Sequence, residues 1–230
     1  MGKHMCGHLM KGSELEMQVY NRTASKADEL VEAGATFTSV EDIAKTCDVI
    51  FIMLGYPHDV EEVVLGDGGL LTHMKEGAIV VDHTTSSPGL AIKVAEAAEA
   101  KGCFSVDAPV SGGDIGAKTG QVVAMCGGHP DAIEKVTPLL EHYSKQVKNM
   151  GALGNGQHTK AANQIMVASS FLGVSEALMY GHKAGLDLNE MVDVTSGGAA
   201  GSFTLTKFAP RMLKRDFDPG FFVEHLIKDL

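Results

Sequence analysis

The sequence has few basic residues, and they are scattered along the chain. It contains 19 Lys and Arg against 29 Asp and Glu, which gives a formal net charge of −10. Proteins that bind nucleic acid or anionic membranes concentrate basic side chains on one surface. In addition, no apolar run approaches the roughly 20 residues that a membrane helix needs. We therefore expect neither nucleic acid nor a membrane among the partners.

The sequence also lacks an apolar segment of the secretory type after Met1, and it lacks any C-x-x-C pair. Four cysteines are dispersed along it: Cys6, Cys47, Cys103 and Cys126. This pattern is typical of reduced, buried thiols, so we expect a cytoplasmic protein. His4 and His8 lie one helical turn apart with Cys6 between them, but no acidic residue or second cysteine accompanies them. We therefore expect no metal site.

Hydrophobic residues make up 44% of the 230 residues, enough for one large domain or two smaller ones. The first two-thirds alternates apolar runs with helical patterns. Expected strands are 16–20, 49–53, 78–82, 104–108 and 121–125, with helices at 24–33 and 88–101. Unbroken apolar strands such as Val49–Met53 suit a parallel sheet covered on both faces. The alternation predicts an α/β fold with a Rossmann-like, doubly wound and mostly parallel sheet.

After Gly156 the pattern becomes entirely helical, with expected helices at 159–184, 189–194, 203–214 and from 223 onward. We expect no strand after Val147. The loop Gly151–Gly156 is the predicted boundary. It separates a nucleotide-binding domain, 1–152, from an all-α substrate or dimerisation domain, 153–230.

Both ends of the sequence depart from what complete domains would show. Met1 opens a helical pattern directly, whereas a doubly wound nucleotide domain begins with a strand and a glycine-rich turn. The last residues, Lys228-Asp229-Leu230, stop inside a helical pattern without a cap. We therefore expect that the first strand is missing and that the helical domain is incomplete.

Two polar clusters stand out against this apolar pattern. Lys160, Asn163 and Gln164 share one face of a helix that begins after the Gly-x-Gly at 154–156. The segment Asp107–Gly113, which reads D-A-P-V-S-G-G, follows an expected strand. A buried lysine can donate a proton to a reacting oxygen, and a serine–diglycine turn can bind a carboxylate. Plainer alternatives stay open: a solvated lysine, a tight turn, and packing of the amides between domains.

In its order of motifs the whole chain resembles the β-hydroxyacid dehydrogenase family, which includes 3-hydroxyisobutyrate dehydrogenase and tartronate semialdehyde reductase. The matching segments are Met1-Gly2 (end of G-x-G-x-M-G), Met53-Leu54 (M-L-P), Asp82–Thr85 (D-x-S-T), Asp107–Gly113, Gly154–Asn163 (G-x-G-x-x-x-K-x-x-N) and Lys228-Asp229 (K-D). The M-L-P loop departs from the family pattern, since it reads Met53-Leu54-Gly55-Tyr56-Pro57 here.

The resemblance implies an NAD(P)-dependent oxidoreductase. Its reaction would interconvert a small β-hydroxyacid, of the 3-hydroxyisobutyrate or glycerate type, and its semialdehyde by hydride transfer. It implies that Lys160 is the general acid and base and that Asn163 assists it. The substrate would be bound by Ser111, Gly112, Gly113 and Gln164. The cofactor would be bound by Gly2, Asn21, Arg22, Thr23, Met53, Leu54, Thr85 and Lys228.

The cofactor preference is read from Asn21-Arg22-Thr23, directly after the expected strand 16–20. NAD enzymes place an acidic residue there to hold the ribose, whereas an arginine suits a 2′-phosphate. We therefore favour NADP, with Lys26 as further support. If Arg22 is only a surface residue, NAD stays open.

Two other functions compete with this one. A 6-phosphogluconate dehydrogenase-like enzyme would carry K-x-x-H-N, but Asn163 occupies the histidine position. A non-catalytic NADP-binding interaction module of the same fold would not need Lys160. Family analogy also predicts a homo-oligomer. The sequence indicates neither the particular hydroxyacid nor the physiological direction.

Overall fold

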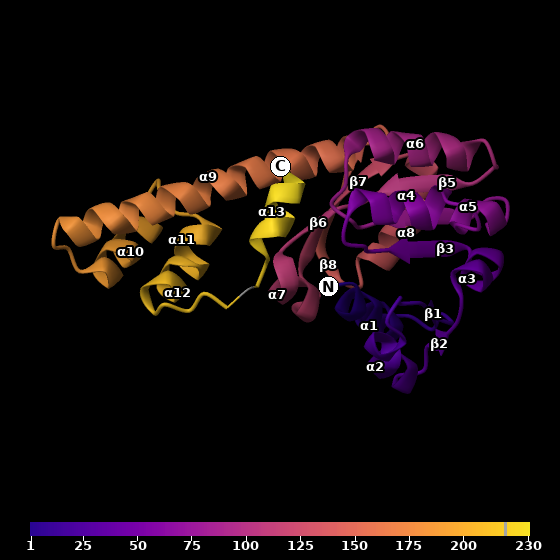
Figure 1. The fold of residues 1–230 in the computed structure, drawn as a ribbon, viewed down its shortest axis with the longest axis horizontal. Helices are drawn as coiled ribbons and strands as arrows, with labels where there is room; N and C mark the ends of the chain where they lie inside the picture. The colour runs from indigo at the N-terminus through magenta and orange to yellow at the C-terminus, as the bar shows by residue number, and fades with distance from the viewer. Residues whose placement is uncertain (219) are drawn as a thin grey trace. The chain divides into compact units, whose positions relative to one another are not determined.

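The structure, a computed structural model, describes residues 1–218 and 220–230, which form two compact units, Met1–Lys160 and Ala161–Leu230 (Figure 1). Sequence analysis placed the boundary in the loop 151–156. In the structure the first unit also includes the start of helix α9 (Asn155–Lys183). The reason is that the first turn of α9 is hydrogen-bonded to the sheet, as described below.

The first unit is built on a six-stranded sheet in the order β3-β4-β5-β7-β6, with β8 paired to β7. These strands are β3 (Val49–Ile52), β4 (Ile79–Asp82), β5 (Phe104–Asp107), β6 (Val110–Ser111), β7 (Val122–Gly128) and β8 (Ser144–Gly151). Neighbours β3–β4, β4–β5 and β7–β8 are parallel, whereas β7 runs antiparallel to β5 and β6. Two short strands, β1 (Gln18–Val19) and β2 (Thr36–Phe37), form a separate parallel pair.

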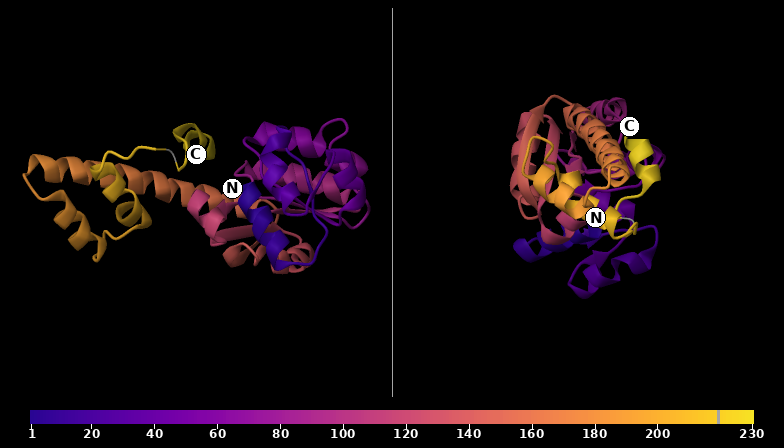
Figure 2. Two further views of the ribbon diagram at one scale, coloured as in Figure 1. Left: turned by 90° about the horizontal axis from the view of Figure 1, so that it is seen from below. Right: turned by 90° about the vertical axis from the view of Figure 1, so that its left-hand side faces the viewer.

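Helices surround this sheet (Figure 2). They are α1 (Gly2–Gly12), a 3-10 turn η1 (Ala24–Ala27), α2 (Asp28–Glu32), α3 (Val40–Thr46), α4 (Pro57–Leu65), α5 (Leu70–His73), α6 (Pro88–Glu99), α7 (Gly113–Thr119) and α8 (Pro130–Leu140). Successive residues of a strand face opposite sides. Accordingly, Ile79 and Val81 of β4 enter one apolar core, and Val80 enters a second. The sheet is therefore buried on both faces, which confirms the expected fold class.

The expectation of no strand after Val147 is wrong, because strand β8 continues to Gly151. It pairs with β7 alone among the described residues, so it lies at the edge of the sheet. Its residues alternate little in hydropathy, and Lys145 and Lys148 are exposed. Edge strands commonly carry charged side chains, which discourage pairing with other chains. Hence β8 lacks the apolar run by which the inner strands were recognised.

The second unit is helical, as expected. After α9 it contains α10 (Leu188–Ser196), α11 (Phe203–Lys207), α12 (Ala209–Leu213) and α13 (Val223–Asp229). The single helix expected at 203–214 is divided at Phe208, because Pro210 near the start of α12 cannot donate a backbone hydrogen bond. Val174 and Leu178 of α9 pack against Val192 and Leu205 in its core.

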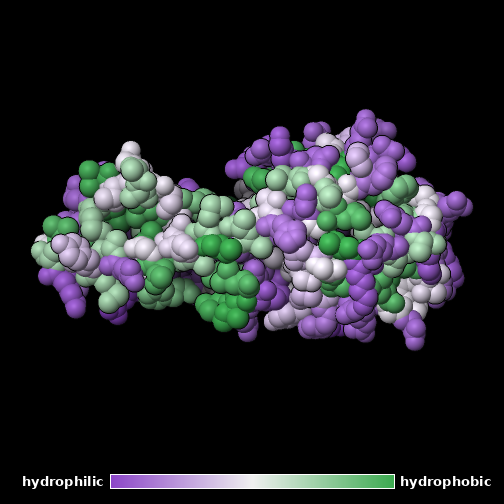
Figure 3. Space-filling view, turned by 90° about the horizontal axis from the view of Figure 1, so that it is seen from above, coloured by the Kyte–Doolittle hydropathy of each residue, from purple (hydrophilic) through white to green (hydrophobic). Residues whose placement is uncertain are grey.

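Helix α9 is unusually poor in charge. Between Ala161 and Gly181 its only acidic or basic residue is Glu176. Apolar side chains are visible on the surface of this unit (Figure 3). Five on α9 are each more than half exposed: Ile165, Met166, Leu172, Met179 and Tyr180. Within the described part of the chain, no helix combines the length and apolar character needed to cross a membrane.

The Gly-x-Gly entry to α9 is required by close packing. Gly154 has a φ of +82°, which favours glycine. At Gly156, an added Cβ would lie 2.4 Å from the carbonyl oxygens of both Asp107 and Met125. These oxygens belong to β5 and β7, so the start of α9 lies directly against two strands.

We expect Gly156→Ala to lower the free energy of unfolding by about 1–3 kcal/mol, because the methyl group would displace main-chain atoms. The matched control is Gly173→Ala in the same helix, where an added Cβ would meet no atom within 4 Å. That change should raise stability by roughly 0.5–1 kcal/mol. Urea unfolding of both variants measures the difference. Equal stabilities would show that α9 does not dock as described.

Candidate active site

Three parallel strands end at one edge of the sheet, and their loops are joined by hydrogen bonds. Such an edge is where doubly wound folds bind ligands. After β3, the amide of Leu54 donates to the Thr84 hydroxyl at 2.9 Å. After β4, the amide of Thr84 donates to the Asp82 carboxylate at 2.8 Å. Thr84 therefore fixes the loop that follows β3 to the loop that follows β4.

His83 anchors the loop after β4 through two buried hydrogen bonds. Its Nδ1 lies 2.7 Å from the carbonyl oxygen of Ala108, and its Nε2 lies 2.8 Å from the Tyr143 hydroxyl. Because a carbonyl only accepts, Nδ1 carries the proton and Nε2 accepts from the hydroxyl. Burial lowers the pKa of His83 to about 4 and raises the pKa of Tyr143. Both groups are thus neutral at pH 7, and His83 holds the loop rather than exchanging protons with a substrate.

Asp107, at the end of β5, caps helix α9. Its two carboxylate oxygens accept from the amides of Gly154 and Gln157, each at 2.9 Å. Burial raises the pKa of Asp107 to about 6, and these amides partly offset that rise. At pH 7 the carboxylate is therefore ionised at the positive end of the helix, which stabilises the start of α9.

Gln157 is a residue whose role sequence analysis missed. Its side chain is only 1% exposed. The amide nitrogen donates to the carbonyl oxygen of Thr84 at 2.8 Å, and the amide oxygen accepts from the backbone of Ser86 at 2.9 Å. The available signal was spacing, since Gln157, Lys160 and Gln164 repeat at i, i+3 and i+7. Such a repeat of polar residues on an otherwise apolar helix predicts a buried polar face.

Lys160 follows Gln157 by one turn and is only 7% exposed. The solvated-lysine alternative is therefore wrong. His158, by contrast, is exposed, as expected for a residue on a different face of the helix.

The serine–diglycine turn lies between β6 and α7. Ser111 pairs with Val123 of β7 and is partly buried. Gly112 and Gly113 have φ values of +124° and +64°. These angles favour glycine whatever the turn binds, so the geometry alone accounts for the Gly-Gly pair.

In the second unit, two expected site residues, Gln164 and Lys228, contact Asp229, and a third, Asn163, contacts Gln164. Asn163 donates to the Gln164 side-chain oxygen at 2.8 Å, and Gln164 donates to Asp229 at 2.6 Å. Lys228 forms an ion pair with the other carboxylate oxygen at 2.7 Å. The Lys228-Asp229 pair was visible in the sequence, but the part of Asp229 in joining these side chains was not.

The residues expected to bind the cofactor include the start of α1 and the loop after β1. Gly2 opens α1, and an added Cβ there would lie 3.4 Å from the Cβ of Met53. The first amides of a helix lack internal partners and attract phosphate. Asn21, Arg22 and Thr23 are all exposed after β1, where Asn21 accepts from the Thr23 amide at 2.9 Å.

A further polar group lies in the loop after β4. The Ser86 hydroxyl is buried and has no hydrogen-bond partner among the described residues. Thr85, beside it, is partly exposed. This loop can therefore offer hydroxyl groups to a bound molecule.

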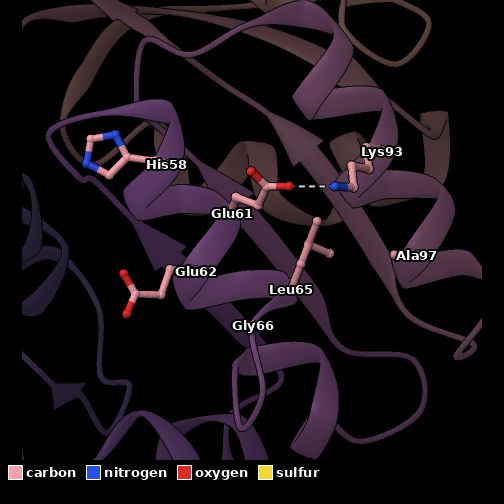
Figure 4. Close-up of a pocket in the computed structure, with 7 residues that line it drawn as sticks. All are labelled: His58, Glu61, Glu62, Leu65, Gly66, Lys93 and Ala97. Atoms are coloured by element: carbon pink, nitrogen blue, oxygen red, sulfur yellow. Dashed lines mark hydrogen bonds and ion pairs between the residues drawn. The ribbon is translucent and has the colours of Figure 1, made fainter.

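A surface groove of about 500 Å³ lies away from all of these residues (Figure 4). It is lined by α4 and α6, where Lys93 pairs with Glu61. None of the expected site residues lines this groove, so it is not part of the candidate site.

Family models match both parts of the chain. Residues 1–151 match the NAD binding domain of 6-phosphogluconate dehydrogenase. Residues 154–230 match the NAD-binding domain of NADP-dependent 3-hydroxyisobutyrate dehydrogenase. The two matches divide in the loop that sequence analysis chose, whereas the compact units divide at Lys160.

Individual proteins resemble the chain over nearly its whole length. A probable 3-hydroxyisobutyrate dehydrogenase-like protein of Arabidopsis thaliana is 47% identical, covering 100% of this chain and 69% of the relative. The 2-hydroxy-3-oxopropionate reductase of Escherichia coli is 39% identical, covering 89% of this chain and 70% of the relative. A solved structure described as Psf3 in complex with NADP+ and 2-OPP is similar, with a TM-score of 0.91 and 28% identity. The match covers 100% of this chain and 81% of the chain in that structure.

The buried His83 predicts a pH-dependent stability. Its pKa falls from an ordinary 6.5 to about 4 on folding, so the unfolded chain takes up the proton first as the pH drops. Stability from this group is present above about pH 6.5 and is lost by about pH 4, at roughly 1.4 kcal/mol per pKa unit. Between pH 7 and pH 4 we expect wild type to lose up to about 3 kcal/mol more than His83→Gln.

The comparison with His83→Gln is needed because Asp107 changes the stability with pH in the opposite direction. Its raised pKa means that the folded protein binds this proton more readily, which adds stability as the pH falls through about 6. Urea unfolding at several pH values, with the exposed His58→Gln as control, isolates the histidine contribution. Parallel pH profiles for wild type and His83→Gln would contradict the assignment.

Proposed function

Because the chain belongs to the β-hydroxyacid dehydrogenase family, a family of NAD(P)-dependent oxidoreductases, we propose that it interconverts a small β-hydroxyacid and its semialdehyde. We assign the substrate to the 3-hydroxyisobutyrate or glycerate type. The names of the Arabidopsis and Escherichia coli relatives support this class. The observation that carries the proposal is the burial of Lys160, one turn after the point where α9 is bonded to the sheet.

In the reductive direction, Lys160 donates a proton to the carbonyl oxygen of the semialdehyde. That oxygen gains negative charge as its carbon is reduced, so a buried cation with a proton to give lowers the barrier. A bound nicotinamide supplies the hydride in this direction and accepts it in the other. For oxidation, neutral Lys160 takes the hydroxyl proton. Asn163 orients the reacting groups by hydrogen bonding, with Gln164 in support.

Ser111 and the turn Gly112-Gly113 bind the carboxylate of the substrate. The hydroxyl of Ser111 is a donor, and glycines allow main-chain amides to approach an anion closely. The position of this turn supports the role, because it directly follows the partly buried Ser111 at the end of β6.

We assign NADP as the preferred cofactor. Arg22, with Asn21 and Thr23, would hold the 2′-phosphate, and Gly2 would present helix amides to the pyrophosphate. Met53, Leu54, Thr85 and Lys228 complete the cofactor site. The exposure of Arg22 supports the choice, since a phosphate can reach it.

We also expect a homo-oligomeric, cytoplasmic enzyme. The apolar side chains exposed on α9 support self-association, because exposed apolar patches commonly mark interaction sites.

Lys160→Met should lower kcat/KM for reduction of short semialdehydes by about 10²- to 10⁴-fold, the usual contribution of a general acid. The matched control is Lys183→Met, an exposed lysine on the same helix, which should leave the rate unchanged. NADPH oxidation is followed for a panel of small semialdehydes. The assay uses this chain and a version extended at both ends by the corresponding segments of the Escherichia coli relative.

An extended wild-type chain that oxidises NADPH with none of these aldehydes would defeat the proposed function. If that chain also bound a partner protein, the result would favour a non-catalytic interaction module over an enzyme. Equal rates for wild type and Lys160→Met would leave an oxidoreductase that uses another proton donor.

Arg22→Ser should weaken NADPH binding by about 10- to 100-fold, since a charge-assisted hydrogen bond to phosphate contributes roughly 1.5–3 kcal/mol. NADH is the internal control, because it lacks the 2′-phosphate, and its affinity should stay the same. Titration calorimetry with both cofactors measures the ratio. An unchanged ratio would mean that Arg22 does not select the cofactor.

A further inference from the structure

The side chain of Gln157 joins the catalytic helix to the loop after β4 through two main-chain groups. These are the carbonyl of Thr84, which accepts at 2.8 Å, and the amide of Ser86, which donates at 2.9 Å. They stand on either side of Thr85. A primary amide, which both donates and accepts, thus pairs with the peptide groups that flank Thr85, much as a neighbouring strand would.

The partners of Gln157 are themselves held in place. Its backbone amide donates to Asp107 at 2.9 Å, which fixes its turn of α9 to β5. Thr84 is bonded through its hydroxyl to Leu54 in the loop after β3. A continuous set of hydrogen bonds therefore runs from the end of β3, through the loop after β4, to α9 and the end of β5.

Lys160 lies three residues after Gln157, so the two side chains leave the same face of the helix. Any rotation or shift of this turn moves Lys160 relative to Thr85. The hydrogen bonds of Gln157 are the ones that directly oppose such a movement, because they link this turn to the residues beside Thr85.

We propose that Gln157 is a positioning residue, which sets the place of Lys160 relative to the Thr85 loop by bonding the Thr84 and Ser86 main chain. This rests on the proposed function, in which Lys160 gives the proton and Thr85 belongs to the cofactor site. Gln157 itself touches neither substrate nor cofactor in this role.

The chemistry of the side chain makes the role testable. Methionine keeps the volume of glutamine but neither hydrogen bond. An ionised glutamate can accept from Ser86, but it sets an oxygen against the Thr84 carbonyl and brings a second negative charge near Asp107. A protonated glutamate has both a donor and an acceptor, so it restores the amide's two bonds.

The first measurement is independent of catalysis. Hydrogen exchange of the Ser86 amide should become at least about tenfold faster in Gln157→Met, because the loss of a hydrogen bond worth about 1.4 kcal/mol has that effect. The control is Gln18→Met, the same substitution at a glutamine that bonds Thr46 of another element. It should leave Ser86 exchange unchanged.

The second measurement is steady-state reduction of a short semialdehyde. We expect Gln157→Met to lower kcat by about 10- to 100-fold with little change in KM, since small misplacements of catalytic groups have effects of this size. Gln157→Glu should be equally slow at about pH 8 and should recover towards wild type as the pH falls to about 5, because burial raises a carboxyl pKa. A merely structural residue would show no such recovery.

Wild-type Ser86 exchange in Gln157→Met, or a kcat that neither variant changes, would overturn the positioning role. So would a Gln157→Glu defect that is the same at every pH. If Gln157→Met fails to fold, Gln157→Glu still decides the question, because it keeps both bonds at low pH and loses the bond to Thr84 at high pH. An inert wild-type chain is a different result, since it refutes the proposed reaction and with it any catalytic use of Gln157.

Discussion

The architecture of the candidate site depends on how the first turn of α9 is held against the sheet. Asp107 places an ionised carboxylate at the helix start, where two amides that lack helical partners donate to it. This contact is possible because Gly156 allows main chain to pack on main chain. A charged group buried without such donors would destabilise the fold, whereas here burial strengthens the hydrogen bonds it makes. The sheet and α9 thus meet through backbone, which leaves side chains such as Lys160 available for the proposed chemistry.

Neutral, buried polar groups also hold this edge of the sheet in place. His83 bridges Ala108 and Tyr143, and the ring of Phe51 stacks on the imidazole at a centroid distance of 5.8 Å. Each polar atom in this bridge has a partner, which is the condition under which a buried network specifies one arrangement. The loop that carries Thr85 is consequently anchored on both sides, by His83 before it and by Gln157 across it.

Most of the fold could be predicted, because the inner strands bury both faces and therefore read as apolar runs. The edge strand β8 could not be predicted, because it is exposed and carries Lys145 and Lys148 in place of an apolar run. In the site, the spacing of Lys160 and Asn163 on one helix was visible in the sequence. The role of Gln157 was not, because its partners are main-chain groups of Thr84 and Ser86, and backbone partners leave no mark on side-chain identity. Asp229 was missed for a related reason: only the folded chain brings it to Gln164.

The burial of Lys160 has a physical consequence for the reaction. Removing an ammonium from water is unfavourable, and lysines are therefore almost always exposed unless they are paired. For the proposed proton transfer, a lysine with 7% exposure on a charge-poor helix must be held by its surroundings in both of its protonation states. Fixing the helix through Asp107 and Gln157 meets part of that requirement, because the orientation of the amine is set before substrate arrives. In the proposed reaction, preorganisation of this kind would lower the reorganisation that accompanies charge development on a carbonyl oxygen.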